Sequence, residues 1–330
     1  MRQNNIFLML LKVFFFSSIL VATSAVRAEL KVVTTIKPLH SLIANVMDGV
    51  GEPALIIEGS TSPHSFTLKP SHAKLLEEAD IIFWVGESIE TFMERPLESI
   101  VKNAEVVEFM EVESINKLKF REESIFEDHD DHDDHDDHDD HDDHDDHDDH
   151  DDHSGHDHHG HAHGEFDAHI WLDPMNAKEM VHEIAHELGD LDPANKNKYE
   201  ANAQATIQAL DQLVNDIEKG INKDAKFVVF HDAYQYFEER FGVRAAGALT
   251  LNTDVLPGAK QIVDIQDVIK DRGIKCIFSE PQFNPKIITT IAEDMNIKTG
   301  VFDPLGANID SNKDLYFKLI QNLGNELKGC

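Results

Sequence analysis

Short runs of β-branched and aromatic residues alternate with amphipathic stretches along most of this 330-residue chain. Each run is bounded by turn-forming residues, and the stretches between runs carry apolar residues at helical spacing. A buried strand followed by a helix is typical of parallel sheets, in which helices cover both faces. The runs that we interpret as strands are residues 30–36, 54–57, 80–85, 105–109, 226–230, 245–251, 275–278 and 298–302.

The eight predicted strands fall into two groups of four, which predicts two lobes. A largely helical region, residues 176–222, separates the groups, and it includes a long stretch rich in alanine and glutamine. The sequence therefore predicts an α/β fold in which each lobe has a mainly parallel four-stranded sheet flanked by helices. One long linking helix joins the two lobes. The predicted boundaries are 29–175 for the first lobe, 176–222 for the helical linker and 223–330 for the second lobe.

The first 28 residues have the features of a cleaved signal peptide. Arg2 supplies the positive charge, residues 6–22 are mostly apolar, and Val26-Arg27-Ala28 places small residues where a signal peptidase cuts. Lys12 and the short apolar stretch argue against a retained membrane helix. We expect cleavage near Ala28, export to a periplasm and no stable insertion into the membrane.

A repeat of Asp-Asp-His occupies residues 128–153 and continues into a second histidine-rich run. Residues 127–164 contain almost no apolar side chains, so they should form a disordered, solvated loop within the first lobe. Imidazole and carboxylate groups together suit divalent transition metals. The candidate metal-binding histidines of this loop are His129, His132, His135, His138, His141, His144, His147, His150, His153, His156, His158, His159, His161 and His163.

The net charge of −34 is concentrated in this loop, and the rest of the chain is only moderately acidic. Such a balance makes nucleic acid an improbable partner and a cation a natural one. Cys276 and Cys330 are the only cysteines. Export favours a disulfide between them, and two free thiols are the alternative.

Isolated histidines and carboxylates follow several of the predicted strands. In open parallel sheets, ligands bind beyond the carboxyl ends of the strands. His64, His231, Glu280 and Asp303 all lie on loops that follow predicted strands, and His169 lies just after the acidic loop. Three imidazoles with a carboxylate or water form a tetrahedral zinc site. The sequence therefore predicts one zinc site made by loops of both lobes.

These residues occur in motifs that resemble a known family. The motifs G-S-T-S-P-H around His64, H-I-W-L-D-P from His169, F-H-D-A-Y-Q-Y-F around His231, F-S-E-P-Q-F and F-D-P-L-G are similar to those of the ZnuA-type periplasmic zinc-binding proteins of ABC importers. The resemblance extends from Leu30 to Cys330. It implies that His64, His169 and His231 hold one Zn²⁺ ion in the cleft between the lobes.

The resemblance also assigns roles to other residues. Asp303 matches a position that supplies a carboxylate ligand in part of the superfamily, so it is a possible fourth ligand, with water as the alternative. Glu280 is expected to support the site rather than bind the metal. Cys276 and Cys330 match the disulfide of the family. Some relatives have a further histidine on one strand and use it in a second zinc site. Here that strand reads A-A-G-A-L-T and has no histidine, so the resemblance does not imply a fixed second site.

His182-Glu183-Ile184-Ala185-His186 matches the H-E-x-x-H motif of zinc metalloproteases, in which Glu183 would be the base. The alternative is a solvent-facing polar stripe on a helix. We favour the stripe, because a protease of this type places the helix against a mostly antiparallel sheet. The chain also presents no activated nucleophile or acid–base pair around a substrate pocket, so an enzyme is not expected.

The sequence thus predicts a monomeric periplasmic protein that captures Zn²⁺ and delivers it to a membrane permease powered by a cytoplasmic ATPase. The acidic loop would be an accessory, low-affinity metal binder. The alternatives are a periplasmic metal buffer that uses the loop alone and the H-E-x-x-H protease.

Overall fold

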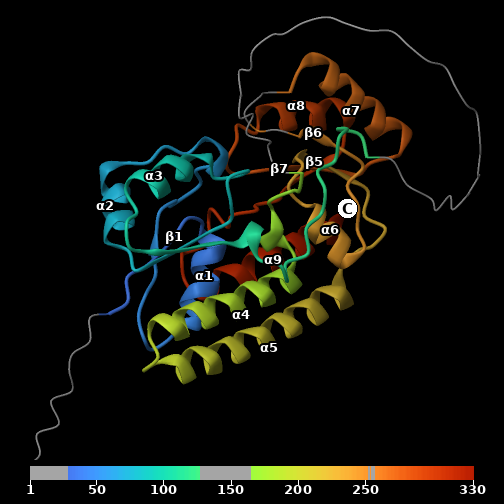
Figure 1. Ribbon diagram of the computed structural model, residues 1–330. Helices are drawn as coiled ribbons and strands as arrows, with labels where there is room; N and C mark the ends of the chain where they lie inside the picture. The colour runs from blue at the N-terminus through green and yellow to red at the C-terminus, as the bar shows by residue number, and fades with distance from the viewer. Residues whose placement is uncertain (1–28, 127–164, 252, 254–256) are drawn as a thin grey trace, which may run out of the picture.

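The structure, a computed structural model, describes residues 29–126, 165–251, 253 and 257–330. The predicted signal peptide and the predicted metal-binding loop of residues 127–164 lie outside this part of the chain. The described residues form two α/β lobes that lie side by side (Figure 1). Among them, no helix combines the length and the hydropathy that crossing a membrane requires.

Both lobes have a four-stranded parallel sheet with the same strand order. The first sheet has the order β2-β1-β3-β4 and the second has the order β6-β5-β7-β8. The strands of the first sheet are β1 (Val32–Thr34), β2 (Ala54–Leu55), β3 (Ile81–Trp84) and β4 (Glu105–Glu108). Those of the second are β5 (Phe227–His231), β6 (Ala248–Thr250), β7 (Cys276–Ser279) and β8 (Lys298–Val301). All pairs are parallel, so the predicted fold class is confirmed.

Helices flank both sheets. The first lobe contains α1 (Lys37–Val46), α2 (Pro70–Glu78) and α3 (Glu94–Ser99). The second lobe contains α6 (Gln235–Phe241), α7 (Ala259–Asp271), α8 (Lys286–Met295) and α9 (Leu315–Glu326). The inner strands β3 and β5 are buried on both faces, as expected for sheets covered by helices, whereas the edge strand β8 is largely exposed.

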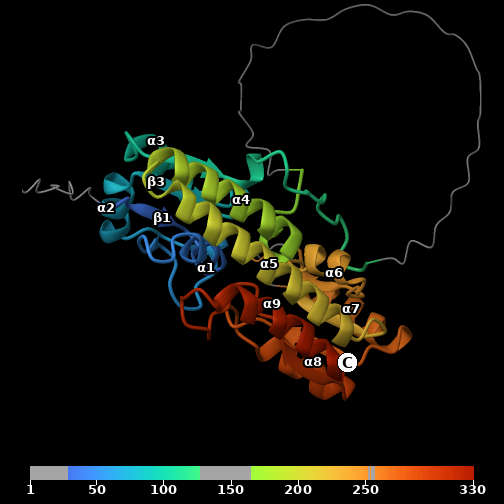
Figure 2. The same cartoon turned by 90° about the horizontal axis from the view of Figure 1, so that it is seen from below.

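A hairpin of two helices follows the first lobe, and its second helix contacts both lobes. The helix α4 (Pro174–Leu191) begins at Asp173, whose side chain accepts a hydrogen bond from the amide of Met175. The helix α5 (Lys196–Gly220) is antiparallel to α4 and contacts both α1 and α9. The two views show α4 and α5 side by side, with α5 extending along both lobes (Figures 1 and 2). The predicted long linking helix corresponds to α5. Because this continuous helix contacts both lobes, it should limit hinge motion between them.

The segment before residue 127 crosses from the first lobe to the second. Ile125 pairs with Gly247 in an antiparallel bridge, next to the amino end of β6. The amide of Phe126 donates to the carbonyl of Ala246, and the amide of Ala248 donates to that of Ser124. A Cβ at Gly247 would lie 2.7 Å from the carbonyl oxygen of Ser124, so only glycine allows this approach. The predicted metal-binding loop therefore leaves the described structure from the second lobe.

Cys276 and Cys330 form a disulfide, as predicted. Cys276 is the first residue of β7, and Cys330 follows the short 3₁₀ turn after α9. The bond therefore ties the end of the chain to an inner strand of the second sheet.

Glu90 is a fully buried carboxyl group at the carboxyl edge of the first sheet, and it predicts a pH dependence of stability. Its Oε2 atom accepts hydrogen bonds from the amides of Val85 and Gly86. Burial raises the pKa of Glu90 to about 7, although the backbone hydrogen bonds oppose the shift. In the unfolded chain the proton leaves near pH 4.3. The stability contributed by protonated Glu90 is therefore complete below that pH and is lost as the pH rises through about 7.

We expect Glu90→Gln to be more stable than the natural chain at pH 8 but not at pH 4, because glutamine stays neutral. Denaturant unfolding at both pH values would measure this. The matched control is Glu98→Gln on the exposed face of α3, which should leave the pH dependence unchanged. If the stability of Glu90→Gln had the same pH dependence as that of the natural chain, burial would not raise the pKa of Glu90 and this account would be wrong.

Candidate metal centre

Three histidines from different parts of the chain converge between the lobes. His64 lies in a 3₁₀ turn (Pro63–Ser65) in the loop after β2, and His169 immediately precedes the turn (Ile170–Leu172) that leads into α4. His231 is the last residue of β5. In this sheet the chain passes from β5 to β6 on one side and from β7 to β8 on the other, so ligands are expected between the carboxyl ends of β5 and β7. The strand order thus explains the position of His231.

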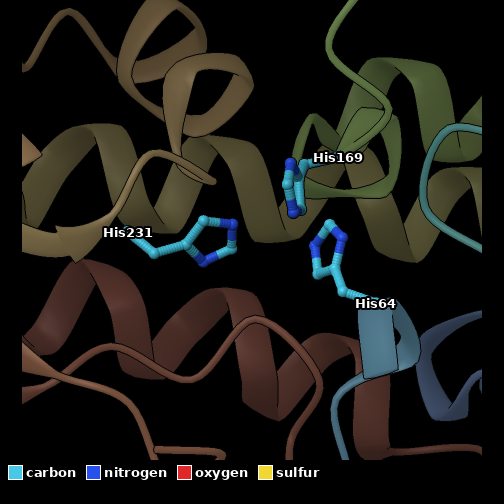
Figure 3. A group of neighbouring side chains, drawn as sticks. All are labelled: His64, His169 and His231. Carbon is cyan, nitrogen blue, oxygen red and sulfur yellow. The ribbon is translucent and has the colours of Figure 1, made fainter. Parts of the chain in front are cut away.

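The three imidazole rings face one another (Figure 3). Their centroids are 5.7 Å apart for His64 and His169, 5.6 Å for His64 and His231, and 4.9 Å for His169 and His231. One potential ligand atom from each ring lies within 4.8 Å of the others. This is the one group of three or more potential ligands found among the described residues. Atoms so placed can reach a single ion after small movements, because zinc–nitrogen distances are about 2.0–2.1 Å.

Buried carboxylates contact the outer nitrogens of two of these rings. Nδ1 of His169 lies 2.7 Å from Oδ1 of Asp167, and Nδ1 of His231 lies 3.1 Å from Oε1 of Glu280. A carboxylate at Nδ1 favours the tautomer in which Nδ1 carries the proton, so Nε2 is free to bind a metal. Nε2 of His64 is buried and has no hydrogen-bond partner in the described structure. An unpartnered buried nitrogen that faces two other imidazoles is what a metal site would present.

Burial favours neutral imidazole at two of the three positions, His64 and His169. Burial lowers the pKa of His64 and of His169 well below the ordinary value, and the neighbouring His231 adds to both shifts. Burial alone would also lower the pKa of His231, but the carboxylates of Glu280, Asp232 and Asp167 together outweigh it, so that pKa is raised. Burial raises the pKa of Asp167 to about 7, against the hydrogen bond from the amide of His169. A bound cation would replace the proton on His231, and the same carboxylates would balance its charge.

The space between the rings is small and its walls come from both lobes. The cavity has a volume of about 10 Å³, which suits one ion or water molecule rather than an organic ligand. Ser62 and Ile89 of the first lobe line it together with Phe283 and Leu305 of the second. These residues shield the rings from solvent, which strengthens electrostatic interactions inside.

Contacts between the lobes hold these walls in place. Nε1 of the buried Trp171 donates a 2.8 Å hydrogen bond to the carbonyl of Pro304, which also lines the cavity. Lys37 of α1 donates to three carbonyls of the loop after β8: those of Gly306, Ala307 and Ile309. The loop of the second lobe is therefore fixed to the first lobe next to the three histidines.

Asp303 lies near the cavity but is engaged in its own loop. Its Oδ1 atom accepts hydrogen bonds from the side chain of Gln282 and the amide of Leu305, and its Oδ2 atom accepts one from Ala307. It does not belong to the group of three potential ligands. Glu280, by contrast, directly contacts His231.

The H-E-x-x-H motif lies on the outer surface, away from this centre. His182 and His186 are exposed on α4, outside its buried stripe of Val181, Ile184 and Ala185. The loop histidines, His129 to His163, lie outside the described residues. The structure thus brings together His64, His169, His231 and Glu280 of the residues predicted from the sequence.

Two residues of the site were missed in the sequence. Asp167 contacts the ring of His169, and its position two residues before a predicted ligand was an available clue. Arg121 was not recognisable, because its partners are far away in the sequence. Its guanidinium group contacts Asp232, directly after His231, and Glu238 of α6.

Comparisons with known proteins agree with this geometry. The profile of a family described as "Zinc-uptake complex component A periplasmic" matches residues 32–330. The high-affinity zinc uptake system protein ZnuA of Brucella abortus is 50% identical over 303 residues, 91% of each chain. Its namesake from Yersinia pestis is 32% identical over 316 residues, 95% of each chain. A crystal structure of ZnuA superimposes with a TM-score of 0.69, at 21% identity, and covers 90% of this chain and 98% of the other, which supports the fold.

Proposed function

We propose that this chain captures Zn²⁺ between its lobes and delivers it to an ABC importer, because it belongs to the family of periplasmic components of zinc-uptake complexes. It acts as a binding protein and not as an enzyme. The observation that carries this proposal is the convergence of three imidazoles from both lobes on a cavity the size of one ion. Nitrogen ligands suit zinc, whereas Mg²⁺ and Ca²⁺ prefer oxygen.

His64, His169 and His231 are the proposed ligands, each through Nε2. Asp167 and Glu280 orient two of the rings and compensate the charge of the ion. We propose water at the fourth position, because the oxygens of Asp303 already accept three hydrogen bonds. An open position is useful in a protein that must release its ion, since structural zinc sites usually have four protein ligands.

Release would involve local loop movement rather than wide opening of the lobes. The helix α5 contacts both lobes, and the hydrogen bonds of Trp171 and Lys37 join them beside the site. The loop that carries His64 is largely exposed between Glu58 and Thr61. Hydrogen exchange with and without zinc should therefore show increased protection mainly in this loop. Large changes across both lobes would contradict the proposal.

The remaining features of the proposal concern export and the acidic loop. The signal peptide would be cleaved near Ala28, and the monomeric mature protein would dock on a permease that a cytoplasmic ATPase drives. The histidines and aspartates of residues 128–163 would bind further ions weakly and raise the cation concentration near the cleft. Their lack of fixed geometry would make them less selective than the cleft.

Deleting residues 128–163 tests this function against that of a metal buffer. Calorimetric titration of the deletion variant with Zn²⁺ should retain one tight site per chain, because the cleft keeps all of its proposed ligands. The weaker binding events of the natural chain should disappear. Loss of all zinc binding would instead support a buffer that uses the loop alone.

Asp167→Asn should weaken zinc binding in the deletion variant by about 10–100-fold, the usual effect of removing a partner behind a ligating histidine. Asparagine keeps the shape of the side chain but not its negative charge. Competition with a chromophoric zinc chelator would measure the affinity. Asp190→Asn is the matched control, because Asp190 contacts the exposed His186 and should not affect the cleft. Equal affinities for Asp167→Asn and the unsubstituted deletion variant would remove Asp167 from the site.

A further inference from the structure

The hairpin of α4 and α5 carries a hollow on its outer surface, apart from the cleft. The hollow has a volume of about 730 Å³. Ala185 of α4 and Ala203 of α5 are both buried and form its floor, and their small side chains leave space above them. The figures show these two helices side by side along their length (Figures 1 and 2).

Potential metal ligands line the walls of this hollow. His182 and His186 come from α4, and Glu200 and Gln204 come from α5. His182 and His186 are four residues apart, so they lie on the same helical face with their Cβ atoms about 5–6 Å apart. Both are exposed, and no core contact has to be broken for them to bind a ligand.

A carboxylate orients one of these imidazoles. Nδ1 of His186 lies 3.5 Å from Oδ2 of Asp190, one helical turn further on, which leaves Nε2 available. Lys196, which also lines the hollow, is paired with the same Asp190 at 2.9 Å. Its positive charge is thus partly balanced, and Glu200 adds a negative charge on the opposite wall.

We propose that His182 and His186 form a second cation site, which takes a divalent transition ion of the Cu²⁺ or Ni²⁺ class. Two imidazoles completed by water suit the tetragonal geometry of these ions and do not suit Mg²⁺ or Ca²⁺. With two protein ligands on an exposed face, the site is weaker than the cleft. Glu183, the would-be base of a protease, has no part in it.

This inference does not depend on zinc capture in the cleft, and it can be tested in the full-length chain. The experiment is a titration with Cu²⁺, in which carbethoxylation of each histidine is followed by peptide mass spectrometry. His182 and His186 should become protected together, at one Cu²⁺ concentration. In His182→Gln, the protection of His186 should move to a concentration at least about tenfold higher, because a single imidazole no longer chelates. His186→Gln should affect His182 in the same way.

Two controls accompany the titration. Glu183→Gln removes the third element of the H-E-x-x-H motif but leaves both imidazoles, so it should not change the midpoint. Nδ1 of His72 in α2 accepts a hydrogen bond from the amide of Lys69, so only its Nε2 is free. His72 therefore reports the response of a histidine that does not chelate. The proposal is overturned if His182 and His186 are protected no earlier than His72. It is also overturned if either substitution leaves the midpoint of the other histidine unchanged.

Discussion

His231→Ala is expected to lower the zinc affinity of the cleft by more than about a hundredfold, because the loss of a ligand should exceed the 10–100-fold effect of losing a supporting group. His231 ends an inner strand and is held by Glu280, so no neighbouring side chain can easily take its place. With His64 and His169 alone, the ion would lose one of its three protein ligands. Chelator competition in the variant lacking residues 128–163 would measure the change.

His182→Ala is the matched control for this measurement. It removes a histidine of the competing H-E-x-x-H motif from an exposed position on α4. The tight site should keep its affinity in this variant, and both variants should remain folded. If His182→Ala abolished tight zinc binding while His231→Ala did not, the assignment of the site to the cleft would be wrong.

Arg121→Met is expected to lower the free energy of unfolding by about 3–5 kcal/mol, the typical cost of leaving buried charges without their partner. Nη1 of Arg121 lies 2.8 Å from Asp232, and Nη2 lies 2.6 Å from Glu238. The two acidic side chains are only 7% and 3% exposed, so water cannot replace the guanidinium group. Burial raises the pKa of Asp232 to about 7 even with Arg121 present.

Denaturant unfolding at pH 9, where Asp232 is ionised in the natural chain, would measure the effect of Arg121→Met. Lys119→Met, two residues away, removes an exposed ion pair with Glu165 and should have little effect. The triple variant Arg121→Met, Asp232→Asn, Glu238→Gln should recover part of the loss, because no buried charge is left unpaired. A stability of Arg121→Met equal to that of the natural chain would show that the three groups are not coupled.

The sheets could be predicted because their signal is local. Runs such as Asp80–Val85 are apolar on both faces, and this pattern indicates a covered strand without knowledge of its neighbours. The rule that ligands lie beyond strand ends then placed His64 and His231 at the same cleft. Strand order was not predicted, since it depends on which strands pair and not on any one strand.

The polar partners could not be predicted, because they depend on segments far apart in the sequence. Arg121 reaches residues more than a hundred positions away, and nothing in the local sequence identifies Asp232 as its partner. The crossing of residues 124–126 to the second lobe was missed for the same reason. Its requirement for Gly247 becomes apparent only when the two segments are placed together.

The H-E-x-x-H motif shows how far a short pattern can mislead. His182 and His186 have the spacing of a protease, yet α4 belongs to a hairpin that connects two parallel-sheet lobes. Spacing predicts that two imidazoles share a helical face, but the tertiary fold decides what surrounds them. The same pair is compatible with a simpler surface chelate.

Anomalous diffraction at the zinc absorption edge tests the central claim most directly. The measurement would use crystals of the full-length chain grown with one equivalent of Zn²⁺. We predict a single strong peak within bonding distance of Nε2 of His64, His169 and His231. A principal peak elsewhere, such as beside His182 and His186, with none between the three cleft histidines, would contradict the account.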